Sequence, residues 1–222
     1  HDTDHGGHPA DGSLTICKGN QSKEIRSTEI RRNKIRQTKD IKEKQIMGIA
    51  VIGDVFIDIK GFSTSTYIPC GRNLGTIQQI HGGVARNVAE DIANVELEPV
   101  FVGTVDDDAM GEAVIQKLNR HKVDTRYMKK VRNGMGTWLA VFDHNGDVVA
   151  SVSKRPEHEA MVQILEESGD EIFANADSIA IEIDMDQEVT KKTFALAEKY
   201  NKKVYALVSN MSVAIERRDL IR

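Results

Sequence analysis

Three carboxylates follow apolar segments of this 222-residue chain and are candidates for holding a polar ligand. Asp54 and Asp58 lie at the far end of the Val- and Ile-rich run 48–58, and Asp184 follows the run 178–183. Such runs are typical of buried strands. Because open α/β sheets bind ligands outside the carboxyl ends of their strands, these three residues are site candidates. Asp54 has the alternative role of a strand-end cap.

A double glycine, Gly82-Gly83, opens a helical pattern and is the second feature that suits a ligand. Apolar residues recur after it at helical spacing, which predicts that Gly83 lies at or just before a helix N-terminus, with Asn87 on the buried side. A helix start exposes unpaired N–H groups and the positive end of the helix dipole, and glycine lets a ligand approach the main chain. The pattern therefore predicts a site for a polar or anionic ligand.

The composition, 40% hydrophobic and 29% charged, is that of an ordinary globular protein. No apolar run approaches the ~18 residues of a membrane span, and the N-terminus lacks the layout of a secretory signal. We therefore expect a cytoplasmic protein with no membrane partner. Cys17 and Cys70 lie far apart without a CxxC motif, which favours free thiols.

Residues 1–46 form a polar, basic leader, expected to be a loop or weak helix, and the compact domain is expected to begin at about Met47. From Lys18 to Lys44 there are ten Lys or Arg against four Asp or Glu. A nucleic-acid arm would explain this run, but a solvated helical face is the simpler explanation, so nucleic acid is not the expected partner. A metal site on the leader is disfavoured, because no helical frame holds its histidines: His1, His5 and His8.

Alternating strands and helices predict a mostly parallel sheet with helices on both faces. After the first strand and helix, the expected elements are strand 100–105, helix 109–121, helix 159–167, strand 178–183, helix 187–200 and strand 203–208. Asn145-Gly146 predicts a β-hairpin between 137–142 and 148–152. The segment 60–80, with short β-prone pieces such as 65–68, is expected to supply a lid.

Three consecutive carboxylates, Asp106, Asp107 and Asp108, precede the helix 109–121. They could bind a metal ion, or they could cap the helix and complement its dipole. The cap is the simpler explanation, and no metal site is predicted.

The residues from Gly48 to about Arg222 resemble the N-terminal part of the ribokinase-like (PfkB) sugar and nucleoside kinases. The resemblance rests on the segments 50–58 and 82–90, and the pseudouridine kinase branch is the most similar. It implies an α/β fold with a mostly parallel, doubly wound sheet and a small β lid from 60–80 and 137–152. It also implies ATP-dependent phosphorylation of a sugar or nucleoside hydroxyl, with ATP and Mg²⁺ as cofactors and pseudouridine as the first candidate substrate.

Residue by residue, the resemblance assigns substrate-binding roles. Asp58 is similar to the carboxylate that accepts hydrogen bonds from sugar hydroxyls. Gly82, Gly83 and Asn87 correspond to parts of the sugar pocket, and Asp184 resembles the polar residue that faces the substrate. A ligand that lacks the matching hydroxyl would leave these buried polar groups unpaired, so the site would select against it.

The chain departs from the family pattern at several positions. Glu96 and Asp106 stand where the family has small residues, at a cost of roughly 1 kcal/mol each if φ is positive there. The segment 207–210 lacks the usual Asp-Pro or Asn-Pro. The Gly-Ala-Gly-Asp run, which supplies the catalytic base and anion hole, does not occur in this sequence. We therefore expect a chain truncated before the ATP-binding half, without a catalytic residue and inactive alone.

Two other functions remain as alternatives. The first is a non-catalytic remnant or a sugar-binding or dimerisation module. The second, a nicotinamide-dependent dehydrogenase, is disfavoured because the first strand is not followed by GxGxxG. An uncovered lid sheet, with Trp138 and Val141 on its apolar side, predicts a homodimer through the lid.

Overall fold

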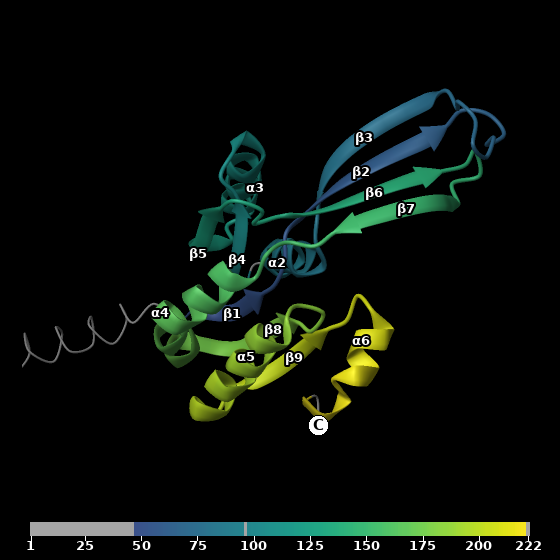
Figure 1. Cartoon of the computed structure of the whole chain (residues 1–222). Helices are drawn as coiled ribbons and strands as arrows, with labels where there is room; N and C mark the ends of the chain where they lie inside the picture. Colours follow the sequence, from purple (N-terminus) through teal and green to yellow (C-terminus); the bar gives the residue numbers. More distant parts are fainter. Residues whose placement is uncertain (1–46, 96, 221–222) are drawn as a thin grey trace, which may run out of the picture. The chain divides into compact units, whose positions relative to one another are not determined.

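The computed structural model describes residues 47–95 and 97–220 (Figure 1). The leader predicted for residues 1–46 lies outside this part, as does Glu96. Nothing therefore tests the expected domain boundary at about Met47, which stays a prediction.

A parallel five-stranded sheet forms the centre of the fold, with strand order β5-β4-β1-β8-β9. Its strands are β1 (Met47–Ile52), β4 (Val100–Asp106), β5 (Asp124–Val131), β8 (Ala176–Glu182) and β9 (Lys203–Leu207). Every residue of β4 from Val100 to Val105 is buried. Such continuous burial is the pattern of a parallel strand that is covered on both faces, as the alternating order predicted.

Helices cover both faces of this sheet. They are α2 (Val84–Asn94) and α3 (Ala109–Arg120) on one face, and α4 (Glu159–Asn175) and α5 (Gln187–Lys199) on the other. Neighbouring strand residues point to opposite faces, so Val51 packs with α2 and α3 while Ile52 packs with α4 and α5. The apolar contacts on both faces hold the carboxyl ends of β1 and β8 side by side at one edge of the five-stranded sheet.

A second, mixed sheet of four strands forms the lid, with strand order β3-β2-β6-β7. Its strands are β2 (Phe56–Ser63), β3 (Gly75–Gly82), β6 (Gly136–Phe142) and β7 (Val148–Lys154). Figure 1 shows them projecting from the end of the five-stranded sheet beside α2. The predicted hairpin joins β6 and β7, where Gly146 has φ 90° and Asp143 Oδ1 accepts hydrogen bonds from the Asn145 and Asp147 N–H groups.

The predicted strand 48–58 is two strands in two different sheets. Residues 53–55 break it, because β1 ends at Ile52 in the parallel sheet and β2 begins at Phe56 in the lid. A Cβ on Gly53 would lie 2.3 Å from the Cβ of Ala85, so the glycine lets α2 pack closely at the crossing. The lid segment 60–80 is strand at its two ends, in β2 and β3, and the expected β-prone piece 65–68 lies in the connecting loop.

Trp138 and Val141 do not share a face of the lid, which corrects the expectation for its apolar side. They are three residues apart in β6, so their side chains point to opposite faces. The strand pairing places Trp138 with Asp58 on the inner face of the lid, the face directed toward the parallel sheet. The opposite, outer face of the lid exposes Ile77, Leu139 and Val152.

Three elements differ from the sequence-based expectation. α4 continues from Glu159 to Asn175 instead of ending near residue 167, and Gly169 lies inside it, where a Cβ would lie 2.6 Å from Leu196 of α5. β5 had not been predicted. Nor had α6 (Met211–Glu216), which precedes the short 3₁₀ turn Arg218–Leu220.

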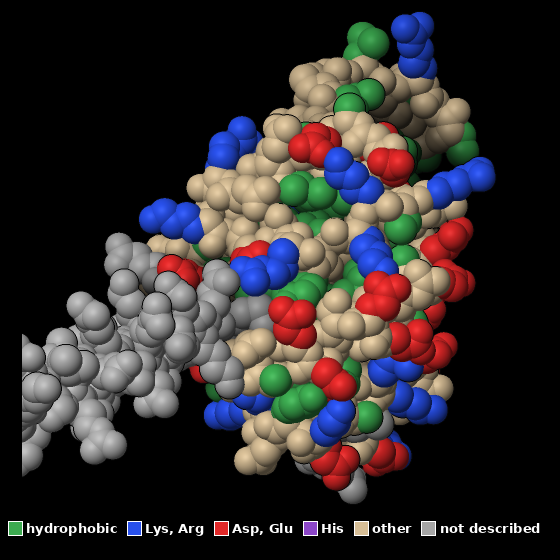
Figure 2. All heavy atoms as spheres, turned by 90° about the vertical axis from the view of Figure 1, so that its left-hand side faces the viewer, with side chains coloured by type: hydrophobic (Ala, Val, Ile, Leu, Met, Phe, Trp, Pro, Cys, Tyr) green, Lys and Arg blue, Asp and Glu red, His purple; other side chains and the backbone are tan. Residues whose placement is uncertain are grey.

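Charges of both signs are interspersed on the face displayed in Figure 2. Ion pairs join charged side chains at the surface: Lys129 lies 2.6 Å from Glu167, and Lys199 lies 2.6 Å from Asp170. Exposed pairs of this kind contribute about 0–1 kcal/mol each to stability. Within the described ranges, no helix is both long and apolar enough to cross a membrane.

Candidate functional site

A cavity of about 860 Å³ lies between the lid sheet, the start of α2 and the carboxyl ends of the central strands. Its lining consists of Asp54, Phe56, Asp58, Gly83, Val84, Asn87, Trp138, Ser153, Arg155, Glu182, Asp184, Ser209 and Asn210. The structure thus brings five of the six predicted site residues to one cavity. Its position follows the rule for open α/β sheets.

Gly82 and Gly83 let the start of α2 approach the carboxylates. Gly83 is the N-cap of α2 with φ 99°, and a Cβ there would lie 2.5 Å from the carbonyl oxygen of Asp54. Gly82 is buried, and a Cβ there would lie 2.4 Å from Asp58 Oδ1. Because the N-cap of α2 is a glycine, no capping side chain covers the first turn of the helix. The N–H groups of that turn therefore remain close to the cavity.

The buried polar residue in the first turns of α2 is Arg86, whereas Asn87 is exposed at the cavity. Arg86 Nε donates to the carbonyl of Gly82 at 2.8 Å, Nη2 donates to that of His81 at 2.9 Å, and the guanidinium pairs with Glu90. These bonds fix the double-glycine turn. The four-residue spacing between Arg86 and Glu90 was the one sequence signal for this pair.

Asp58 lies on the inner face of the lid with its side chain 20% exposed, and Lys60 Nζ is 3.8 Å from its Oδ2. Burial raises the pKa of Asp58 above its ordinary value, although the charges of Lys60 and Arg86 act in the opposite direction. Both carboxylate oxygens can accept hydrogen bonds from a ligand in the cavity.

Asp184 presents one unpaired carboxylate oxygen. Its Oδ2 accepts hydrogen bonds from the N–H groups of Ser209 at 2.9 Å and Asn210 at 2.7 Å, and from the Ser209 hydroxyl. Oδ1 is buried and has no hydrogen-bond partner among the described residues. A proline in place of Ser209 or Asn210 could not donate, so the departure from the family pattern at 207–210 has a structural role. A ligand donor would satisfy Oδ1.

Two buried side chains at the cavity, Glu182 and His158, had not been predicted. His158 Nε2 lies 2.9 Å from Asp54 Oδ1, and its Nδ1 lies 3.3 Å from Asp186 Oδ2. Glu182 Oε2 accepts a hydrogen bond from the Asp54 N–H at 3.3 Å. The two contacts with Asp54 span more than a hundred residues of sequence, so no local pattern could reveal them.

Their environment shifts both pKa values upward. Burial, followed by the charge of Asp54, raises the pKa of Glu182 to about 7, against hydrogen bonds from the Asp54 and Ala85 N–H groups. Burial lowers the pKa of His158, but the hydrogen bond and charge of Asp54, together with Asp186, outweigh it and raise that pKa.

The acidic run before α3 has structural partners. Asp108 Oδ1 caps α3 by accepting from the Met110 and Gly111 N–H groups, as the simpler explanation predicted. Asp106 Oδ1 accepts from the Met135 N–H at 3.1 Å. Its φ is not positive, so the strain expected there does not arise. Among the described residues no group of three His, Cys, Asp or Glu side chains could hold a metal ion.

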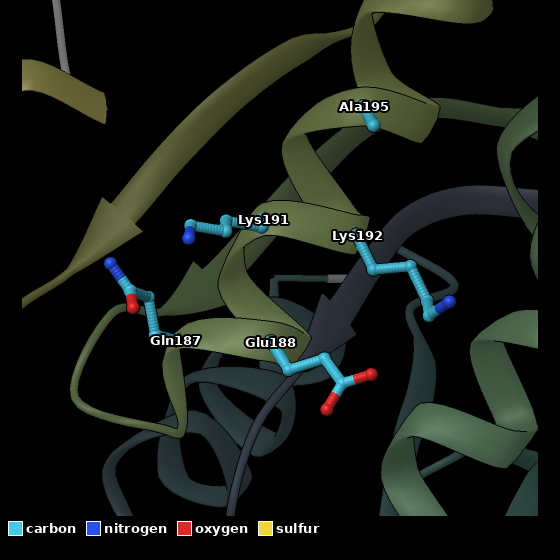
Figure 3. A pocket seen from close by; sticks show the side chains of 5 residues that line it. All are labelled: Gln187, Glu188, Lys191, Lys192 and Ala195. Carbon is cyan, nitrogen blue, oxygen red and sulfur yellow. The ribbon is translucent and has the colours of Figure 1, made fainter.

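A second hollow, of about 430 Å³, lies on the outer surface of α5 (Figure 3). It is lined by Gln187, Glu188, Lys191, Lys192 and Ala195. Their side chains point in different directions in Figure 3, and Lys192 pairs with Glu166 at 2.9 Å. Because its polar groups do not converge on one point, it is not a binding candidate.

Comparison with known proteins identifies a family. The family model described as "pfkB family carbohydrate kinase" matches residues 48–216. The guanosine-inosine kinase of Exiguobacterium acetylicum is 31% identical over 175 residues, which cover 78% of this chain and 58% of that protein. The ribokinase of Arabidopsis thaliana, in complex with ribose and ATP, has a TM-score of 0.66 at 20% identity, covering 75% of this chain and 55% of that one.

The pseudouridine kinase of Escherichia coli (strain K12) is 24% identical over 109 residues, covering 47% of this chain and 34% of that protein. The guanosine-inosine kinase matches a longer segment at higher identity, which corrects the expectation that the pseudouridine kinase branch is the most similar. The chain spans a little over half the length of the guanosine-inosine kinase and of the ribokinase.

Proposed function

Because the chain belongs to the pfkB family of carbohydrate kinases, we propose that it forms the acceptor-binding part of a kinase that phosphorylates a nucleoside or sugar hydroxyl. The observation that carries the proposal is the single cavity holding Asp58, Asp184 and the N-terminus of α2. Asp58 and the free Oδ1 of Asp184 accept hydrogen bonds from sugar hydroxyls. Gly83 and Asn87 complete the pocket at the start of α2.

A nucleoside is favoured over a free sugar by the aromatic side chains at this cavity. Phe56 and Trp138 line it beside the carboxylates, so a base can stack on an aromatic ring while its ribose reaches Asp58. Its volume, about 860 Å³, lies at the upper end of common ligand pockets. The similarity to a guanosine-inosine kinase makes guanosine and inosine the first candidates, with pseudouridine second.

The described cavity does not suit ATP. Asp54, Asp58, Glu182 and Asp184 line it against one guanidinium, that of Arg155, whose Nη1 is already bound to the main-chain oxygen of Asp184 at 2.6 Å. This acidic lining opposes a triphosphate. The family's Gly-Ala-Gly-Asp run, which would supply the base and anion hole, is not in the sequence. The chain as given therefore binds its acceptor without phosphorylating it.

The first prediction concerns turnover. Purified chain with ATP, magnesium and inosine, guanosine, pseudouridine or ribose should release no ADP above background, because the sequence lacks the Gly-Ala-Gly-Asp run that supplies the family's base and anion hole. Fusing the part of the Exiguobacterium acetylicum guanosine-inosine kinase that the chain does not match should restore nucleoside-dependent ADP release. The fusion carrying Asp58→Ala is its control. ADP release by the chain alone that disappears in Asp58→Ala would show that the chemistry lies in the chain itself.

Self-association is the second part of the proposal. The outer face of the lid exposes Ile77 at 79%, Val152 at 71% and Leu139 at 44%, and an uncovered apolar sheet face favours association. We predict a homodimer in sedimentation velocity at micromolar protein. Ile77→Lys with Val152→Lys should yield a monomer, whereas Thr76→Lys on the other face of β3 should not. A monomeric unmodified chain would refute the dimer.

A further inference from the structure

Four ionisable side chains form a network that begins at the cavity wall and continues behind it. Asp54, Glu182 and His158 are only 4–5% exposed, and Asp186 lies at the surface. They come from four places in the fold: the turn between β1 and β2, the end of β8, the N-cap of α4 and the N-cap of α5. Asp58 and Asp184 can accept hydrogen bonds from sugar hydroxyls without this network. The presence of four ionisable groups here therefore needs a separate explanation.

The geometry favours the charged form of His158. Its Nε2 lies 2.9 and 3.1 Å from the two carboxylate oxygens of Asp54, and its Nδ1 lies 3.3 Å from an oxygen of Asp186. An ionised carboxylate only accepts hydrogen bonds, so a proton on each ring nitrogen satisfies both neighbours. These contacts favour an imidazolium that faces Asp54 on one side and Asp186 on the other.

One imidazolium is too little charge for the buried acids around it. Asp54, Glu182 and Asp184 are each 4% exposed. Arg155, the arginine that lines the cavity, binds the main-chain oxygen of Asp184. Like charges in a buried site cannot all be ionised, so one of these acids retains a proton. Asp54 has His158 beside it and Asp184 accepts three hydrogen bonds, whereas Glu182 faces the charge of Asp54.

We propose that His158 is a positioning residue that pairs with the Asp54 carboxylate and so keeps the retained proton on Glu182. The cavity floor then offers a hydrogen-bond donor, Glu182, beside the acceptors Asp58 and Asp184. This deepens the proposed function, because a donor and acceptors together match the hydroxyls and ring nitrogens of a nucleoside. The test below requires no ligand, so failure of the proposed function would leave it standing.

The free energy of unfolding should depend on pH through the same two groups. The pKa of Glu182 is raised from an ordinary 4.5 to about 7, so the folded state binds this proton more tightly than the unfolded state does. The stabilisation is complete below pH 4.5 and is lost as the pH rises to about 7. His158, whose pKa is raised from 6.5, adds a second loss that begins as the pH rises above 6.5. Glu182→Gln should remove the first loss and leave the second.

The direct test follows the carboxyl carbons of Asp and Glu by ¹³C NMR during a pH titration of the full chain, with Glu182→Gln identifying the Glu182 signal. In the unmodified chain Glu182 should titrate at about pH 7. In His158→Asn the last proton should leave the Asp54–Glu182 pair at higher pH, by about one unit, because Asp54 loses its cation. In Asp54→Asn the Glu182 midpoint should fall, because the neighbouring negative charge is gone.

A role for His158 in packing alone would lower stability without moving these midpoints. Midpoints in His158→Asn and Asp54→Asn that coincide with that of the unmodified chain would therefore overturn the proposal. If His158→Asn does not fold, Asp186→Asn provides a second test, read from the NMR signals of the His158 ring, since Asp186 is at the surface with its side chain 72% exposed. That change removes a negative charge beside the His158 ring and should lower the pH at which His158 titrates. An unchanged His158 midpoint would contradict the assignment.

Discussion

Replacing Gly83 by alanine is expected to lower the free energy of unfolding by about 3–5 kcal/mol, through strain and overpacking. Gly83 has φ 99° at the N-cap of α2, where L side chains are strained. Its Cβ would also lie 2.5 Å from the carbonyl oxygen of Asp54 and 3.1 Å from the Phe56 nitrogen, and neither backbone atom can yield easily. Urea denaturation of the variant and the unmodified chain measures the difference.

Gly146→Ala is the matched control for the Gly83 substitution. Gly146 has a similar φ of 90°, but no atom lies within 4 Å of its added Cβ. It should therefore cost only the strain, about 1–2 kcal/mol. Equal losses at the two positions would mean that the close approach of α2 to residues 54–56 contributes nothing.

Replacing Asp58 by alanine is expected to weaken nucleoside binding about 10- to 100-fold, the value of one or two hydrogen bonds to a charged group. Asp58 is directed into the cavity from the inner face of the lid, and the variant leaves sugar hydroxyls without their acceptor. Calorimetric titration with inosine measures the change.

Asp58→Asn is the control, because it keeps the shape and one acceptor oxygen while removing the charge. Its affinity should fall between those of the unmodified chain and Asp58→Ala. An alanine variant that binds inosine within twofold of the unmodified chain would exclude Asp58 as a ligand.

Buried apolar runs explain why most of the fold could be predicted from the sequence. β4 and β8 are apolar and covered on both faces, and Asn145-Gly146 identified the hairpin of the lid. β5 escaped prediction because it is an edge strand with several charged residues, including Lys129 and Lys130, and its pattern does not alternate.

Whether a residue of the site could be predicted depends on how far its partners lie from it in the sequence. Asp58 and Gly83 could be identified because each stands in a local pattern, a strand and a helix start. Arg86 lies in the same helical pattern, but its charge argued against burial, and only the carbonyls of His81 and Gly82 explain its position. His158 and Glu182 reach Asp54 from 104 and 128 residues away, which no spacing encodes.

Trp138 provides the most direct measurement of the central claim, that a nucleoside occupies the cavity between the lid and α2. It is the one tryptophan of the chain and lines this cavity, so its fluorescence reports on the site alone. Titration with inosine should produce a saturable change that fits one site per chain, with a weaker midpoint in Asp58→Ala. A fluorescence that does not change, or a saturable change with the same midpoint in Asp58→Ala, would contradict the account.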